Sequence, residues 1–209
     1  MAPERRSQTF WLALAFEGGL GVIAAALAWS FGVPLLAQLP VDGPHVAWGV
    51  VATLPMLAGY WMLVGSRRPA LRKIQHLVEW FARELFPHGS LWKIAIVSAL
   101  AGLGEEALFR GVLQPLGTRW AGLVVGEQSA VIVGLVVASL LFGAAHCLSR
   151  LYFFLATLVG LYFGVLAIAF DSITPAVIAH GLYDFAVLVL LTRGLREREE
   201  DVGRVSDPP

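Results

Sequence analysis

The chain has 209 residues, of which 57% are apolar and only 14% are charged. A soluble domain is about 45–50% apolar and about 25% charged, and a domain of this size cannot hide so large an apolar excess, so a bilayer must be its solvent. Fifteen basic residues balance fifteen acidic ones, and Cys147 is the one cysteine. These counts exclude a nucleic-acid binder and a disulfide scaffold. Without a dividing polar linker, residues 1–209 are expected to form a single integral membrane domain.

Six continuous apolar runs are long enough to cross a bilayer, because a helix of about 20 residues spans the hydrocarbon core. The runs lack the alternation of an outer-membrane barrel. We therefore predict an all-α fold, a polytopic membrane protein with about six transmembrane helices. The runs cover about residues 10–31, 46–65, 91–113, 128–147, 151–170 and 173–191.

The segment between the second and third runs has a different pattern. Over residues 69–87, apolar residues such as Leu71 and Ile74 recur at helical spacing, with charged residues such as Arg72 and Lys73 on the other side. This predicts one amphipathic helix on the cytoplasmic surface of the membrane. A solvated connector helix is the alternative. The polar residues 193–209 are expected to be a disordered tail.

The basic residues orient the predicted spans. If the N-terminus is inside, Arg119 is the only Lys or Arg residue of the outer segments, so both termini are expected to lie in the cytoplasm. The membrane is expected to be the inner membrane of a prokaryotic cell. A cleaved signal peptide is the alternative for the first run, although Glu17 interrupts it. The inner segments contain Arg5, Arg6, Arg67, Arg68, Arg72, Lys73, Arg83, Arg150, Arg193, Arg196, Arg198 and Arg204.

Several ionisable residues lie within the predicted spans, where a charge at the bilayer centre costs roughly 2.5–3.5 kcal/mol. Such residues indicate a functional site, and buried polar pairs that only fix helix packing are the alternative. They occur in the third, fourth and sixth runs and are Glu105, Glu106, Arg110, His146, His180 and Asp184.

The spacing of these residues separates the two glutamates. Glu106 and Arg110 are four residues apart, so they lie one turn apart on one helix face and can pair. Glu105 points about 100° away from Glu106 and need not share the arginine. Gly102 and Gly104 leave room beside Glu105 for another backbone or for a substrate. A poorly solvated glutamate without a cationic partner is a usable general base.

Glu105, His146, His180 and a water molecule make a minimal hydrolytic set. The chain offers no nucleophile in a suitable context, because neither Ser139 nor Ser149 lies in a nucleophile elbow. The metalloprotease motif H-E-x-x-H is absent, as is a pair of intramembrane aspartates.

Three short motifs follow one another along the chain. They read Glu105-Glu106-Ala-Leu-Phe-Arg110, then Phe142-Gly-Ala-Ala-His146, then His180-Gly-Leu-Tyr-Asp184. In this order and within membrane spans, they resemble the CPBP family of CAAX proteases and bacteriocin-processing enzymes, also called Abi, which are intramembrane glutamic endopeptidases. The resemblance covers about residues 91–191, and the first two runs carry no matching motif.

The resemblance implies hydrolysis of a peptide bond at the membrane. By this analogy Glu105 is the general base that activates water, and His146 positions that water. His180 with Asp184 would contact the oxyanion, whereas Glu106 with Arg110 would hold the helix, supported by Phe142. Eukaryotic members of the family trim prenylated CAAX proteins and bacterial relatives process peptides or serve in bacteriocin immunity.

Two features of this sequence do not fit the family roles directly. The family often has Asn where this chain has Asp184, so we expect an ionised Asp184 to orient His180; a protonated Asp184 that donates to the oxyanion is the alternative. On a straight helix, Glu105 lies about 18 Å from Lys93 and falls in the outer half of the membrane. His146 falls near the inner end of its run, so straight helices do not bring the two together.

We therefore expect a metal-independent membrane endopeptidase without a cofactor, whose partners are lipid and a peptide or protein substrate. One alternative is a zinc protease in which His146 and His180 bind the metal with Glu105 or Asp184. Another is a non-catalytic membrane protein, such as a proton-coupled carrier or an immunity or scaffold protein. The sequence specifies neither the substrate nor the oligomeric state.

Overall fold

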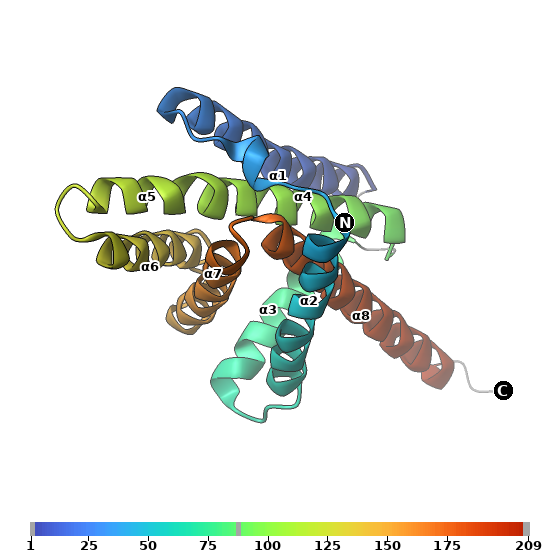
Figure 1. Cartoon of the computed structure of the whole chain (residues 1–209). Coiled ribbons are helices and arrows are strands. Elements are labelled where there is room, and N and C mark those ends of the chain that lie inside the picture. Colours follow the sequence, from blue (N-terminus) through green and yellow to red (C-terminus); the bar gives the residue numbers. More distant parts are fainter. Residues whose placement is uncertain (1–2, 87–88, 207–209) are drawn as a thin grey trace.

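The computed structural model describes residues 3–86 and 89–206, with side chains described over 8–86 and 89–194. Within these ranges the chain forms helices and no strand (Figure 1). The all-α prediction is confirmed. In chain order the elements are α1 (Pro3–Phe31), η1 (Leu35–Gln38), α2 (Gly43–Val64), α3 (Pro69–Leu85), α4 (Leu91–Leu108), η2 (Phe109–Leu113), α5 (Gln114–Ala121), α6 (Glu127–Ala145), α7 (Arg150–Phe170) and α8 (Thr174–Ser206).

Five helices of the described chain are long and apolar enough to cross a membrane: α1, α2, α6, α7 and α8. The third predicted span, 91–113, begins with α4, which is not one of these five helices. Its 18 residues contain three charged ones, Lys93, Glu105 and Glu106. It is nevertheless part of the bundle. It continues through η2 into α5, so that the helical path runs on from Leu91 to Ala121.

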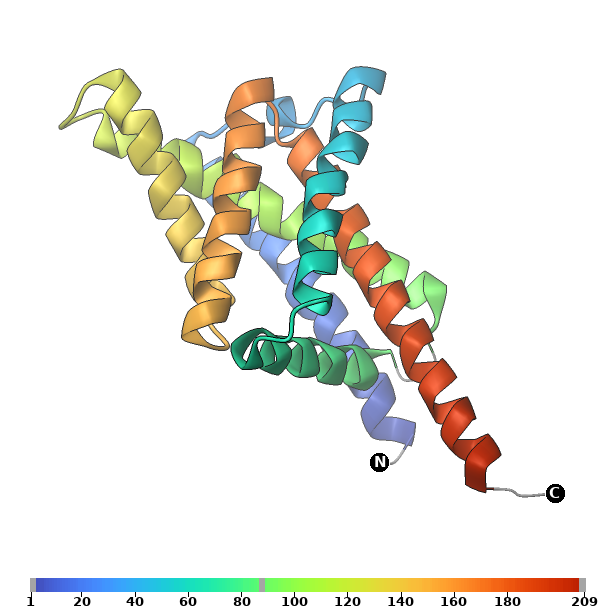
Figure 2. The ribbon, with the colours of Figure 1, turned by 90° about the horizontal axis from the view of Figure 1, so that it is seen from below.

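The third helix is the amphipathic one. Pro69 starts α3 at its first turn, where its missing N–H removes no helix hydrogen bond. Figure 2 shows α3 lying across the end of the bundle, almost perpendicular to α2. Ile74 is buried, as the spacing predicts, and so is Ala82, whereas Phe81 of the predicted apolar face is exposed.

The last helix is longer than the sequence indicates. The backbone of α8 is helical to Ser206, although we expected a disordered tail from residue 193. The run after Arg193 is rich in Arg and Glu, which have high helix propensity, so the helix propagates beyond the apolar part. Residues 207–209 of that expected tail lie outside the described residues.

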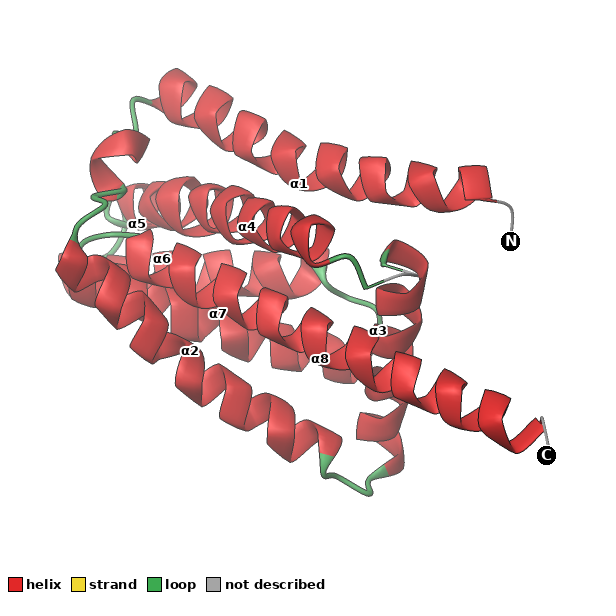
Figure 3. Cartoon of the chain, turned by 90° about the vertical axis from the view of Figure 1, so that its right-hand side faces the viewer, coloured by secondary structure: helices red, strands yellow, loops and turns green. Residues whose placement is uncertain are grey.

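Both ends of the described chain lie at the same end of the bundle as α3 (Figures 2 and 3). The path α1, α2, α4 to α5, α6, α7 and α8 therefore passes through the bundle back and forth and returns to the starting side. The basic residues Arg67, Arg68 and Arg72 lie at or beside the start of α3. Arg119 lies near the far end of α5, which is the distribution on which the predicted orientation rests.

Two glycines let α4 approach its neighbours α1 and α8 closely. A Cβ added to Gly102 would lie 2.7 Å from the carbonyl oxygen of Val177 and 2.8 Å from the nitrogen of Gly181. A Cβ added to Gly104 would lie 2.5 Å from the carbonyl oxygen of Glu17. The glycines beside Glu105 therefore make room for the backbones of α1 and α8, which is the first of the two predicted uses, and not for a substrate.

The helical path changes its winding directly after the two glutamates. Phe109–Leu113 forms a π-helix, a local widening that is frequent at functional sites. Pro115 cannot donate to the carbonyl of Gly111, and the side-chain nitrogen of Gln38 donates to that carbonyl instead at 3.0 Å. The segment between α1 and α2 thus supplies a hydrogen-bond donor to one carbonyl of the widened turn.

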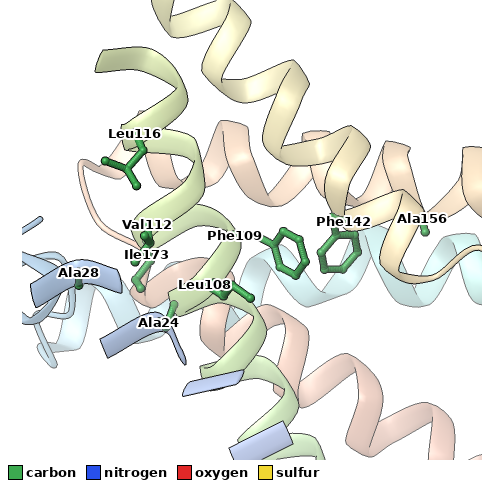
Figure 4. Packing of buried hydrophobic residues seen from close by; sticks show 10 residues of the cluster. Ala24, Ala28, Leu108, Phe109, Val112, Leu116, Phe142, Ala156 and Ile173 are labelled. Carbon is green, nitrogen blue, oxygen red and sulfur yellow. The ribbon is translucent and has the colours of Figure 1, made fainter. Parts of the chain in front are cut away.

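The largest apolar cluster surrounds this turn. Figure 4 shows Phe109 and Phe142 packed edge to face, with ring centroids 5.2 Å apart, between the α4 and α6 backbones. Ala24 and Ala28 of α1 pack on the opposite side of α4. The segment that carries Glu105, Glu106 and Arg110 is therefore held on several sides by apolar packing.

We predict that Gly102→Ala destabilises the protein by about 1–3 kcal/mol, because α4 and α8 must separate to admit the methyl group. The measurement is thermal unfolding in detergent. Gly18→Ala is the control, since a Cβ at Gly18 of α1 would meet nothing within 4 Å. An unchanged midpoint for Gly102→Ala would contradict the close crossing of α4 and α8.

Candidate active site

A buried arginine lies at the centre of the motif residues. Arg110 is only 1% exposed, and its Nη1 donates to Oε1 of Glu106 at 3.0 Å. Glu106 is 0% exposed. The pairing predicted from their four-residue spacing is confirmed. An unpaired charge in this position would cost several kcal/mol, so each residue of the pair requires the other.

Arg110 also joins α4 to two other helices. Its Nη2 donates to the carbonyl oxygen of Gly160 in α7 at 3.1 Å, and its Cζ lies 4.3 Å from the ring centroid of Phe142 in α6. A Cβ on residue 160 would lie 3.2 Å from Nη2, so glycine allows this approach. Phe142, predicted as a supporting residue, thus covers the guanidinium with its ring.

His180 of α8 contacts both an α4 glutamate and its own helix neighbour. Its Nδ1 lies 2.8 Å from Oε1 of Glu106, and its Nε2 lies 3.4 Å from Oδ2 of Asp184. The ring of Phe163 stacks on the imidazole with centroids 5.0 Å apart. Sequence spacing predicts the contact with Asp184 but misses the shorter one with Glu106, because that partner comes from another helix.

Glu105 and His146 face each other. Oε2 of Glu105 lies 3.5 Å from Nε2 of His146, and this oxygen is buried without a hydrogen-bond partner. Nδ1 of His146 lies 2.9 Å from the carbonyl oxygen of Phe142. A carbonyl can only accept, so Nδ1 carries the proton, and Nε2 of a neutral His146 presents a lone pair toward Glu105.

The separation in depth expected from straight helices is therefore wrong for Glu105 and His146. Figure 2 shows α4 crossing α2 and α7 obliquely, so that distance along α4 does not translate directly into depth. His146 follows the last residue of α6 as its C-cap, and its ring stacks on Phe142 with centroids 4.4 Å apart. The inclination of α4 and the early end of α6 bring the two motifs together.

The site opens on a cavity of about 770 Å³. His146, His180 and Asp184 lie on its wall together with Phe142. The remaining wall comes from α2, α3, α7 and α8 and is mainly apolar. This size and lining are typical of a pocket that encloses an apolar ligand beside a few polar groups.

A further carboxylate lies close to these residues. Oε2 of Glu17 in α1 is buried without a hydrogen-bond partner, and Glu17 interacts electrostatically with Asp184, His180 and Glu105. In the sequence Glu17 interrupts the first apolar run. An ionisable residue within a membrane span indicates a functional site, so the sequence contains a signal for Glu17 as well.

Among the residues that the structure describes, no three His, Cys, Asp or Glu side chains are arranged to hold a metal ion. His180 has its Nδ1 committed to Glu106. His146 has its Nδ1 on the Phe142 carbonyl. Only the Nε2 atoms of both histidines would remain for a metal, and metal independence stays a prediction.

We predict that Glu106→Gln lowers the free energy of unfolding by about 3–5 kcal/mol, because Arg110 is left buried without its anion. Glu105→Gln is the matched variant, and it should leave the unfolding midpoint unchanged or raise it, since no cation contacts Glu105. Thermal unfolding of both purified proteins makes the comparison. Equal destabilisation by the two variants would contradict this assignment of the ion pair.

The comparisons with known proteins agree with this geometry. The family model described as "Type II CAAX prenyl endopeptidase Rce1-like" matches residues 87–186, which include all three motifs. No curated protein and no solved structure gives a significant match. The family match supports a CAAX-type membrane endopeptidase in general. The segment that carries Glu105, His146 and His180 is therefore similar to the Rce1-like family of CAAX proteases.

Proposed function

We propose that the protein is a glutamic intramembrane endopeptidase in which Glu105 activates water to attack a peptide carbonyl. The observation that carries this proposal is that the two adjacent glutamates have different partners. Oε1 of Glu106 binds both Arg110 and His180, and its Oε2 is unpaired. No Lys or Arg of the described residues pairs with Glu105, whose own unpaired Oε2 lies 3.5 Å from Nε2 of His146. A carboxylate in this position is available to take a proton.

In the first step Glu105 accepts a proton from water while the water oxygen forms a bond to the peptide carbonyl carbon. Nε2 of His146, which faces Glu105, accepts the second water hydrogen in a hydrogen bond and orients the nucleophile. Glu105 then gives its proton to the amide nitrogen as the C–N bond breaks. The products are a carboxylic acid and an amine.

His180 is positioned to stabilise the oxyanion of the tetrahedral intermediate. A carboxylate only accepts, so Nδ1 of His180 donates to Glu106 at 2.8 Å and fixes the ring. Nε2 lies on the cavity side, 3.4 Å from Asp184, which is long for a strong hydrogen bond. A proton on Nε2 can therefore be donated to a substrate oxygen that lies near the ring plane, with Asp184 supporting the protonated ring.

The substrate is proposed to be a peptide or protein at the membrane. The family description names CAAX prenyl substrates, and the mainly apolar cavity beside His180 suits an apolar side chain or a lipid modification. By the positive-inside rule, the α3 end with its basic residues lies in the cytoplasm of a prokaryotic cell.

Glu105→Gln should reduce hydrolysis by at least about 10²-fold without loss of folded protein, because it removes the base and keeps the shape. The assay is cleavage of a farnesylated peptide ending in Cys, two aliphatic residues and one further residue, followed by mass spectrometry with the enzyme in lipid nanodiscs. A folded Glu105→Gln variant with wild-type turnover would refute the proposed base.

The same assay separates the zinc alternative. We expect the wild-type enzyme to retain its activity after prolonged chelation and to contain no stoichiometric zinc by elemental analysis. A zinc enzyme requires ligands about 2.0–2.2 Å from the metal and would lose activity with the chelator and regain it with added zinc.

The role of Asp184 is tested by two substitutions. Asp184→Asn keeps the shape and can still bond to His180, so most activity should survive. Asp184→Ala removes the support of His180 and should lower kcat by about 10–100-fold. Wild-type kcat in Asp184→Ala would remove Asp184 from the mechanism, whereas an inactive but folded Asp184→Asn would show that its charge is indispensable.

A further inference from the structure

All four tyrosines of the chain line the cavity beside the proposed active site. Tyr60 comes from α2, Tyr152 and Tyr162 from α7, and Tyr183 from α8. The rest of the lining is mainly aliphatic and aromatic. The cavity thus gathers tyrosines from three helices, of which α2 lies far from α7 and α8 in the sequence.

The four hydroxyls differ in their hydrogen bonding. The hydroxyl of Tyr162 donates to the carbonyl oxygen of Ala52 in α2 at 2.7 Å. Among the described residues, those of Tyr60, Tyr152 and Tyr183 have no hydrogen-bond partner, and none of the three is sealed inside the protein. Tyr60, Tyr152 and Tyr183 all lie on the wall of the same cavity, so one ligand could meet all three.

Three unpaired hydroxyls beside apolar side chains need a partner from outside the protein. An O–H group that loses water without gaining a new acceptor costs roughly 1–3 kcal/mol. A peptide that enters an apolar cavity has the complementary problem, because its carbonyl oxygens lose their water. Hydrogen bonds between the two sets would satisfy both.

The charges on the wall select the kind of acceptor. No Lys or Arg is among the described residues that line the cavity, and Glu79 and Asp184 contribute carboxylates to it. Apart from the His180 ring, which is already paired with Glu106 and Asp184, a free carboxylate of a ligand would meet no cation on this wall and would be repelled by the two carboxylates. Neutral peptide carbonyls fit the wall better.

We propose that Tyr60, Tyr152 and Tyr183 form a subsite that binds the backbone carbonyls of the substrate peptide and aligns the peptide bond with His180 and Glu105. This inference rests on the proposed protease function. It assigns a substrate-binding role to residues outside the three motifs, and Tyr60 lies outside the family match as well.

The test measures binding, so that turnover is not required. The probe is the farnesylated peptide described above, titrated into Glu105→Gln protein in nanodiscs, with Kd as the readout. Adding Tyr60→Phe, Tyr152→Phe or Tyr183→Phe should each raise Kd by about 2- to 10-fold, the value of one neutral hydrogen bond. Tyr162→Phe is the matched control and should leave Kd unchanged, because its hydroxyl is already bonded to Ala52.

A second arm identifies the acceptor on the peptide. Replacing one peptide bond of the probe by an ester, whose carbonyl is a weaker acceptor, should raise Kd with intact tyrosines. The same replacement should have less effect in the matching Tyr→Phe variant, as in a double-mutant cycle. A probe with a C-terminal amide should bind as well as the free acid. Loss of binding on amidation would show a carboxylate site and overturn the carbonyl assignment.

The outcomes separate this inference from the proposed function. If wild-type enzyme cleaves the probe and Glu105→Gln does not, but no Tyr→Phe variant changes Kd, the hydroxyls hold only water and this inference alone fails. If the probe binds in a tyrosine-dependent way but is never cleaved, the proposed function fails and the subsite stands. Absence of binding, or an equal change in Tyr162→Phe, also overturns the subsite.

Discussion

The burial of Arg110 is the constraint on which the arrangement of the site depends. A guanidinium that is 1% exposed inside a membrane protein requires an anion nearby, because an unpaired buried charge is costly. Glu106 supplies the anion, the Gly160 carbonyl accepts a second hydrogen bond, and the Phe142 ring covers one face. These partners come from α4, α7 and α6, so one charged side chain fixes the relative position of three helices.

The same interaction determines how the two adjacent glutamates differ. The oxygen of Glu106 that binds Arg110 also accepts from Nδ1 of His180, which brings α8 into the network. Glu105, one residue earlier, points away from the arginine toward His146. A network that neutralises one carboxylate and leaves its neighbour without a cation provides a stable core and, in the proposed mechanism, the base.

The sequence predicts the local part of this arrangement well. Helical spacing identifies the Glu106–Arg110 and His180–Asp184 pairs, because residues four apart share a helix face. It cannot predict the contact of His180 with Glu106 or the proximity of Glu105 to His146, because these depend on the inclination of α4 and on where α6 ends. The helical extension of α8 does not follow from polar composition, because Arg and Glu are typical of disordered segments and also favour helices.

The central claim, that Arg110 belongs to Glu106 and leaves Glu105 free, is tested most directly by two double-mutant cycles on unfolding free energy. The variants are Arg110→Gln combined with Glu106→Gln, and Arg110→Gln combined with Glu105→Gln. We expect a coupling energy of about 1–3 kcal/mol for the first pair and less than about 0.5 kcal/mol for the second. Equal couplings, or a larger coupling with Glu105, would show that the arginine neutralises the proposed base and would contradict the account.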